Sequence, residues 1–181
     1  MKTIVITGST RGIGYGLADA FLERGCVVGI SGRTAPNVER AIETLSAKHG
    51  AERVWGQPCD VTEYEQVQAL WDAAQAHYGR VDVWINNAGL GHSQCDLSRM
   101  SPDEMETIVQ ANLVGTMYGA KVALCGMLEQ GRGSLYNMEG LGSDGRRGEG
   151  LTVYATTKYA VRFLTESLVL ETKGTPVLVG A

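Results

Sequence analysis

Short apolar segments alternate with longer amphipathic segments along the whole chain, and this alternation constrains the fold more than any other feature of the sequence. The apolar segments, predicted as strands, are Thr3–Thr7, Val27–Ser31, Arg53–Gln57, Val81–Asn86, Ser134–Met138 and Pro176–Val179. The amphipathic segments, predicted as helices, are Gly14–Arg24, Asn37–His49, Glu63–His77, Pro102–Glu129 and Tyr154–Thr172. Because the strands are apolar runs rather than alternating patterns, both faces of their sheet must be covered. We therefore predict an α/β fold, a doubly wound parallel sheet in three αβα layers, with ligands at the carboxyl ends of the strands.

The composition excludes several classes of protein. The 181 residues contain no repeat, low-complexity tract or linker, so residues 1–181 are predicted to form a single domain. A net charge of −4 and a pI near 5.4 predict no nucleic-acid or membrane partner. No apolar stretch approaches the ~18 residues of a membrane span, and neither a transmembrane helix nor a signal peptide is expected. The cysteines and histidines are scattered, which favours reduced thiols, a cytoplasmic protein and no metal site.

A glycine-rich turn follows the first predicted strand and opens the first predicted helix. It reads Thr7-Gly8-Ser9-Thr10-Arg11-Gly12-Ile13-Gly14. Residues without a Cβ let the backbone approach a pyrophosphate that lies on the helix N-terminus. The spacing is G-x-x-x-G-x-G, which differs from the dinucleotide pattern G-x-G-x-x-G. Taken alone, the turn fits either a nucleotide site or a purely structural turn.

Four further motifs follow the glycine turn in order along the chain. Asp60-Val61 comes after the third predicted strand, Asn86-Asn87-Ala88-Gly89 comes after the fourth, Asn112 lies in Q-A-N-L-V-G, and Tyr154 and Lys158 form Y-x-x-x-K. With these motifs the whole chain resembles the single-domain branch of the short-chain dehydrogenase/reductase family. The resemblance implies a Rossmann-type domain that transfers hydride between a nicotinamide cofactor and a carbonyl or alcohol substrate.

The family's motifs also imply which residues bind the cofactor. They are Gly8, Thr10, Arg11, Gly12, Ile13, Gly14, Arg33, Asp60, Val61, Asn87, Ala88, Gly89, Tyr154 and Lys158. Proteins that use NAD place a carboxylate about 20 residues beyond the glycines, where it bonds the ribose 2′-hydroxyl. The corresponding segment here, residues 30–34, contains no acid. Arg33 and Arg11 can both reach a 2′-phosphate, so NADP is predicted; two solvated surface arginines are the alternative.

The resemblance assigns the chemistry to Tyr154, Lys158 and Asn112. In the family's mechanism the tyrosine phenol donates a proton to the carbonyl oxygen while hydride reaches the carbon. A free phenol has a pKa of about 10 and needs help near neutrality. Lys158 lies four residues on, on the same helix face, and its charge is expected to favour the phenolate. Asn112 is expected to hold a water that links the lysine to solvent.

A second hydrogen-bond donor for the carbonyl is missing from its usual place. Most family members read close to N-I-S-S after the fifth strand, with the working serine three residues past the asparagine, but this chain reads Asn137-Met138-Glu139-Gly140. Ionised Glu139 would repel a developing alkoxide. Ser143 lies three residues further on in a glycine-rich segment that can curl, and it is therefore predicted as the catalytic donor. A backbone N–H near Gly140 or Leu141 is the alternative.

The same loop resembles that of the chlorophyll b reductases, which carry N-M-D/E-G-x-G-S, a glycine-rich insertion and Y-x-x-T-K. The match covers Asn137–Ser143 and Tyr154–Lys158, and it implies a shared architecture without fixing the substrate. Substrate selection is expected from two loops, Leu90–Met100 and Gly142–Thr152. The expected partner is a small-molecule carbonyl substrate, and the pair Arg146-Arg147 in the second loop either meets an anionic or carboxylated substrate of this kind or lies in solvent.

Three expectations concern the whole protein. The predicted helices Pro102–Glu129 and Tyr154–Thr172 are apolar around most of their circumference, which either internal packing or subunit association explains. The family resemblance implies a homodimer or homotetramer. Family members continue past the sixth strand with a substrate lid and a seventh strand, and this chain, which stops at Ala181, is expected to lack both. The alternative function is a catalytically weak or inactive NADP(H)-binding sensor or scaffold, because Glu139-Gly140 replaces the usual strand tip.

Overall fold

Six parallel strands form one sheet in the computed structural model, which describes residues 1–92 and 94–181. The strands are β1 (Thr3–Ile6), β2 (Val27–Gly32), β3 (Val54–Pro58), β4 (Val83–Asn86), β5 (Gly133–Asn137) and β6 (Val177–Gly180). Their order is β3-β2-β1-β4-β5-β6, and each lies within two residues of its predicted bounds. The predicted doubly wound parallel sheet is thus confirmed. The direction of winding reverses between β1 and β4, and the crevice above this point is the usual ligand site of such a sheet.

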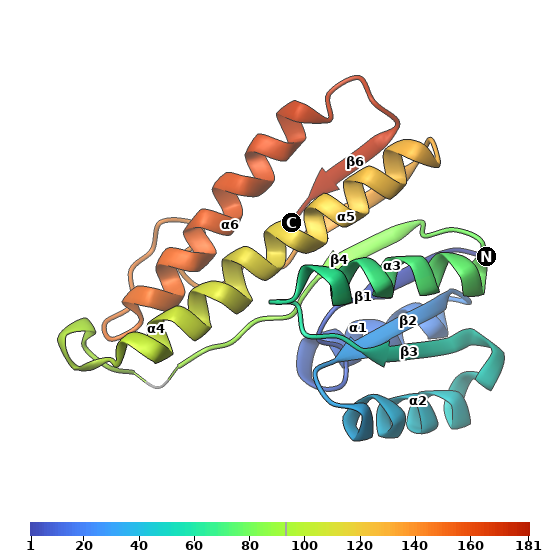
Figure 1. Ribbon diagram of the computed structural model, residues 1–181, viewed down its shortest axis with the longest axis horizontal. Helices are drawn as coiled ribbons and strands as arrows, with labels where there is room; N and C mark the ends of the chain where they lie inside the picture. The colour runs from blue at the N-terminus through green and yellow to red at the C-terminus, as the bar shows by residue number, and fades with distance from the viewer. Residues whose placement is uncertain (93) are drawn as a thin grey trace.

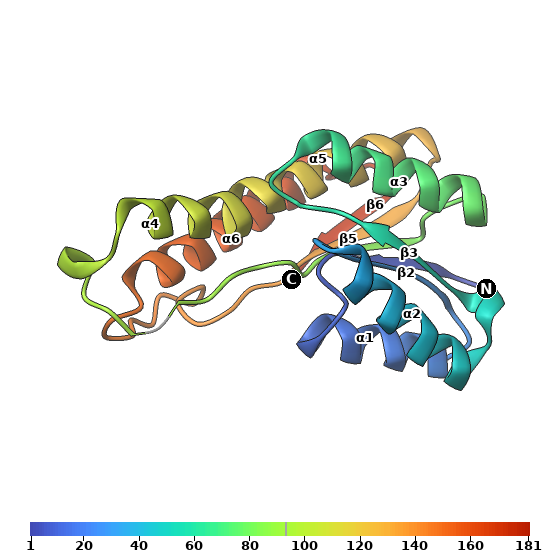
Figure 2. The same cartoon turned by 60° about the horizontal axis from the view of Figure 1, so that its bottom comes forward.

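The helices cover both faces of the sheet. They are α1 (Gly12–Glu23), α2 (Ala35–His49), α3 (Tyr64–Tyr78), α4 (Pro102–Val109), α5 (Gly115–Glu129) and α6 (Thr152–Glu171). Figures 1 and 2 show α1 and α2 on one face, and α3, α5 and α6 on the other. In both views α4 and the first turns of α6 extend side by side past the carboxyl ends of the strands. Within the described residues, no helix combines the length and the apolar character needed to cross a membrane.

The predicted helix Pro102–Glu129 is interrupted, so this prediction was wrong in one respect. A π-helical turn, Gln110–Val114, separates α4 from α5, and the Gly115 N–H donates to the carbonyl of Gln110. A π turn adds one residue to the helical circuit, and such turns occur frequently at functional sites. This turn contains Asn112, whose side chain is fully buried. The apolar pattern continues through the turn, which explains why the sequence did not reveal it.

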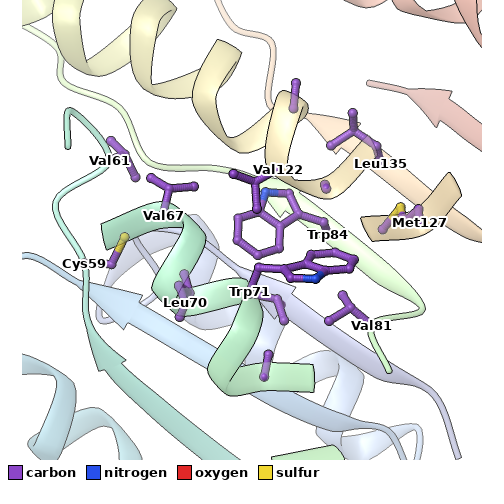
Figure 3. Packing of buried hydrophobic residues seen from close by; sticks show 14 of the residues in the cluster. Cys59, Val61, Val67, Leu70, Trp71, Val81, Trp84, Val122, Met127 and Leu135 are labelled. Carbon is purple, nitrogen blue, oxygen red and sulfur yellow. The ribbon is translucent and has the colours of Figure 1, made fainter. Parts of the chain in front are cut away.

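The largest hydrophobic core fills the space between the sheet and the helices α3 and α5. Its centre is the pair Trp71 on α3 and Trp84 on β4, with ring centroids 5.9 Å apart (Figure 3). Gly126 on α5 lies against this pair, since a Cβ there would collide with the Trp71 ring. A side chain at position 126 would therefore push α5 away from α3. The core therefore fixes the position of α5, the helix that directly follows the π turn at Asn112.

Candidate active site

Each glycine of the turn after β1 is favoured by a different feature of the local structure. Gly8 and Gly12 have φ values of +63° and +59°, which other residues adopt only with strain. A Cβ on Gly8 would lie 2.8 Å from the Ala88 Cα, and one on Gly14 would collide with the Asn87 side chain. Around Gly12 there is nothing within 4 Å of the Cβ position. The backbone at the N-terminus of α1 therefore faces open space, as a pyrophosphate site requires.

That open space belongs to a cleft of about 960 Å³ along the carboxyl ends of β1, β2 and β4. The predicted cofactor residues that line it are Gly8, Thr10, Arg11, Gly12, Ile13, Gly14, Arg33, Asp60, Val61, Asn87, Ala88 and Gly89. Lining residues outside the predicted cofactor set include Thr34, Asn37, Thr62, Leu90, Thr107 and Gln110. Leu90 begins a loop expected to select the substrate, and Gln110 opens the Q-A-N-L-V-G segment, but neither was predicted to bind the cofactor. Only the folding of α4 and the π turn over the cleft brings Thr107 and Gln110 into it.

The N-N-A-G motif holds the cleft wall together. The Asn87 Nδ2 donates to the carbonyl oxygens of Thr7 and Gly8, at 2.9 Å each. The Thr7 hydroxyl in turn accepts from the N–H groups of Asn87 and Ala88, at 3.0 and 3.1 Å. These four bonds tie the end of β4 to the turn after β1. The motif therefore fixes the shape of the glycine turn across the switch point of the sheet.

Asn112 joins three elements through its side chain. Its Oδ1 accepts from the Leu90 N–H at 2.6 Å, while its Nδ2 donates to the Leu90 carbonyl at 2.9 Å and to the Thr157 hydroxyl at 3.1 Å. The Thr157 hydroxyl donates to the carbonyl of Tyr154 at 2.7 Å. The amide thus locks the segment after β4 onto the first turns of α6. The water predicted at Asn112 stays a prediction.

Tyr154 and Lys158 lie on the first turns of α6, where α6 passes the tip of β5. Lys158 is buried, and its Nζ donates to the Met138 carbonyl at 2.8 Å. Burial lowers the pKa of Lys158, and the nearby Glu139 carboxylate opposes that shift. The Nζ lies 5.9 Å from the centroid of the Tyr154 ring. The ammonium group is therefore close to the phenol but bonded to the backbone of the strand tip.

Burial raises the pKa of the Tyr154 phenol above its usual value. The Lys158 Nζ donates to the Met138 carbonyl rather than to the phenol oxygen. That the charge of Lys158 favours the phenolate stays a prediction. The protonated phenol is the form that can donate a proton to a carbonyl oxygen.

Gly89 connects the cleft to this pair of residues. It lines the cleft, and a Cβ at this position would lie 3.1 Å from the Asn112 Oδ1 and 3.7 Å from the Lys158 Nζ. The inner end of the cleft therefore lies next to Lys158. The structure brings the predicted nucleotide residues and the predicted chemical residues together at one place, with only a glycine between them.

The tip of β5 contacts the phenol through Gly140. A Cβ on Gly140 would lie 2.5 Å from the Tyr154 Oη, so a larger residue would require the phenol to shift. Ser143, the predicted second donor, is 7% exposed, and its hydroxyl donates to the Gly140 carbonyl at 2.7 Å. That Ser143 donates to a substrate stays a prediction.

The two loops predicted to select the substrate lie against each other. The Cys95 N–H donates to the Gly150 carbonyl at 3.0 Å, which joins the loop after β4 to the loop before α6. Arg146 pairs with Asp144, with 2.5 Å between Nε and Oδ2, so its charge is satisfied within its own loop. Residue 93, inside the first of these loops, lies outside the described residues.

Comparisons with known proteins agree with this geometry. A family model described as short chain dehydrogenase matches residues 2–181. Chlorophyll(ide) b reductase NOL, a chloroplastic protein of Arabidopsis thaliana, is 42% identical to this chain over 170 residues. The match covers 93% of this chain and 49% of the relative, so the chain spans about half of that protein's length. The NADP-bound structure of ElxO has a TM-score of 0.91 and 28% identity, covering 98% of this chain and 71% of that chain. The NADH complex of 3-ketoacyl-(acyl-carrier-protein) reductase from Brucella melitensis has a TM-score of 0.90 and 27% identity, covering 98% and 72%. The chain belongs to the short-chain dehydrogenase family.

Proposed function

We propose that this protein is an NADPH-dependent carbonyl reductase in which Tyr154 is the proton donor. The observation that carries the proposal is the contact at Gly89, where the cleft of the glycine turn ends beside Lys158. A cofactor in the cleft would therefore present its reactive end next to Tyr154 and Lys158. If the glycine turn were purely structural, nothing would require its cleft to end beside Tyr154 and Lys158.

The lining of the cleft fits a nicotinamide dinucleotide, which supplies the hydride when it is bound. The open backbone at Gly12 suits a pyrophosphate, and Asp60 and Val61 line the cleft beyond the end of β3. Arg33 directly follows β2, and Arg11 precedes α1 on the same cleft. Two guanidinium groups at this end, with no carboxylate at the end of β2, favour a 2′-phosphate and hence NADP over NAD.

Residues of the chain donate the proton, stabilise the phenolate and hold the first turn of α6 in position. The neutral Tyr154 hydroxyl donates its proton to the carbonyl oxygen of the substrate, and the resulting phenolate is stabilised by the Lys158 ammonium group nearby. The Asn112–Thr157 hydrogen bonds hold the first turn of α6 in position. The substrate approaches between the loops 90–100 and 142–152, which are joined at Cys95 and Gly150.

For the substrate we propose a large carbonyl compound of the chlorophyll(ide) b kind. The support is the identity of 42% to a chlorophyll(ide) b reductase and the shared N-M-E-G-x-G-S loop, whose Gly140 contacts Tyr154 in this structure. The location in the cell stays a prediction: the sequence predicted the cytoplasm, whereas this relative is named as chloroplastic.

The test is turnover by the full-length protein with NADPH, using chlorophyllide b and a panel of simpler ketones and aldehydes. We expect Tyr154→Phe to abolish turnover while leaving NADPH affinity unchanged, because the phenol hydroxyl is the proposed proton donor. Tyr136→Phe, at an exposed position of β5 outside the cleft, is the matched control and should leave turnover intact. Equal activity of Tyr154→Phe and the wild type would contradict the proposed mechanism.

A non-catalytic NADP(H)-binding sensor or scaffold remains the second candidate. The feature that favours it is Glu139-Gly140 at the strand tip, where no side-chain hydroxyl is available. For this function we expect NADPH binding with no turnover on any carbonyl, by the wild type and by Tyr154→Phe alike. The same experiment therefore separates the two candidates.

We also propose that the protein associates with copies of itself through α5 and α6. Large apolar side chains stand exposed on these helices: Met117, Leu128, Tyr159, Phe163, Val169 and Leu170. Tyr159, Phe163 and Leu170 are four and seven residues apart, so they form one stripe along α6. An apolar stripe of this kind is typical of a face that a partner covers. A homodimer or homotetramer is the expected assembly.

A further inference from the structure

The turn at residues 140–143 suggests a second hydrogen-bond donor that is not a side chain. We propose that the backbone N–H of Leu141 is the group that, together with the Tyr154 hydroxyl, binds the carbonyl oxygen of the substrate. In this arrangement Ser143 shapes the turn rather than contacting the substrate. The inference rests on the proposed carbonyl reductase function and identifies how this chain compensates for the missing serine.

The position of Gly140 places this turn at the reacting atoms. A Cβ on Gly140 would lie 2.5 Å from the Tyr154 Oη and 3.4 Å from the Lys158 Cε. A substrate oxygen that accepts a hydrogen bond from the phenol lies within about 3 Å of that Oη. Such an oxygen is therefore close to the backbone of residues 140 and 141. Gly140 itself supplies no side-chain donor at this place.

The orientation of the peptide between Gly140 and Leu141 leaves its N–H available. The Gly140 carbonyl accepts from the N–H of Ser143 at 3.0 Å and from its hydroxyl at 2.7 Å, so it points into the turn. The peptide is trans, and in a trans peptide the N–H points opposite to the carbonyl. The Leu141 N–H therefore points out of the turn. Within the described part of the chain it donates to no other group, and Leu141 is 47% exposed.

Two features fix the turn in this conformation. Gly142 has a φ of +99°, and a Cβ there would lie 2.6 Å from the Ala155 Cβ, so the turn packs directly on the first turn of α6. Ser143 is buried and donates its hydroxyl proton to the Gly140 carbonyl. A hydroxyl bonded in this way holds the turn, and its proton is already used within the turn. Backbone N–H groups held rigidly toward a developing oxyanion are an established means of transition-state stabilisation.

The decisive variant replaces Leu141 by its α-hydroxy acid in the full-length protein, which exchanges this one N–H for an ester oxygen. We expect kcat to fall by about 10²–10³-fold while NADPH affinity is unchanged, as for the loss of one oxyanion donor. The ester also weakens the Gly140 carbonyl as an acceptor, and Ser143→Ala measures that effect separately. We expect Ser143→Ala to lower kcat by less than about tenfold. The corresponding ester at Gly174, an exposed glycine between α6 and β6 whose N–H donates to no group in the described part of the chain, is the control and should change nothing.

A further variant, Gly140→Ser, places a hydroxyl where most of the family has one. We expect it to lower kcat rather than raise it, because its Cβ would meet the Tyr154 Oη. The inference is wrong if the Leu141 ester keeps more than half of the wild-type kcat, if Ser143→Ala alone loses as much as the ester, or if Gly140→Ser is faster than the wild type. A wild type without carbonyl turnover would instead contradict the proposed function, and the inference with it.

Discussion

At the scale of single residues, Glu139 is the most unusual feature of the site, because it places a carboxylate beside a buried lysine. Burial lowers the pKa of Lys158 and Glu139 raises it, so the two effects oppose each other. Glu139 also acts on Arg162 further along α6, whose ion-pair partner is Glu166 at 2.9 Å. We expect Glu139 to serve as a local counter-charge for Lys158. This role would explain why position 139 is acidic, although a carboxylate there would repel the alkoxide that develops on the substrate.

The consequence is a prediction for the pH dependence of activity. In Glu139→Gln the opposing effect is lost, so the pKa of Lys158 falls further and the lysine loses its proton at a lower pH. We expect the alkaline limb of the kcat/KM profile to move to lower pH, with kcat near the acid side little changed. Glu171→Gln, on an exposed position at the end of α6, is the control. An alkaline limb that stays in place would show that Glu139 does not hold the charge of Lys158.

Arg33 carries the prediction for cofactor preference. Arg33→Ala should weaken NADPH binding by about 1–3 kcal/mol, the range for a hydrogen bond to a charged group, and leave NADH binding nearly unchanged. Equilibrium titration with both cofactors measures the difference, with Arg24→Ala, an exposed residue outside the cleft, as the control. Equal losses for both cofactors would refute the 2′-phosphate role.

At the scale of elements, the packing of α5 on α3 decides where the π turn and Asn112 lie. Gly126→Ala should destabilise the protein by about 1–3 kcal/mol, because the added methyl group collides with Trp71 in a filled core. Gly16→Ala on α1 is the matched control: nothing lies within 4 Å of its Cβ, so the better helix former should stabilise by about 0.5–1 kcal/mol. Urea unfolding of both variants measures the two changes. The same sign for both would contradict the packing described for α5.

At the scale of the whole molecule, association is the prediction that the exposed stripe on α6 carries. Full-length protein at micromolar concentration should scatter light as a dimer or tetramer, and Phe163→Glu should shift it toward the monomer because the charge would be buried in the contact. Ala76→Glu, on the exposed side of α3, is the control for an added charge. A wild type that stays monomeric would contradict the proposed interface.

The sequence by itself determined the sheet, the helices on both sides of it and the motif residues that form half of the lining of the cleft. These features follow from local patterns: apolar runs mark buried parallel strands, and the glycines at 8, 12 and 14 are required by backbone angles and close approaches that any chain with this turn would need. The motifs at Asn87 and Tyr154 lie next to the ends of strands, so their meeting at one edge of the sheet follows from the parallel topology.

Only the tertiary structure decided which contacts and hydrogen bonds form within the site. The Lys158 bond to the Met138 carbonyl and the contact between Gly140 and the Tyr154 hydroxyl both join α6 to the tip of β5. They depend on where α6 crosses that tip, and no periodicity or motif spacing carries this information. The π turn at Asn112 is local, but the apolar pattern of the sequence continues through it unchanged. The raised pKa of Tyr154 likewise comes from burial, which is a property of the folded chain.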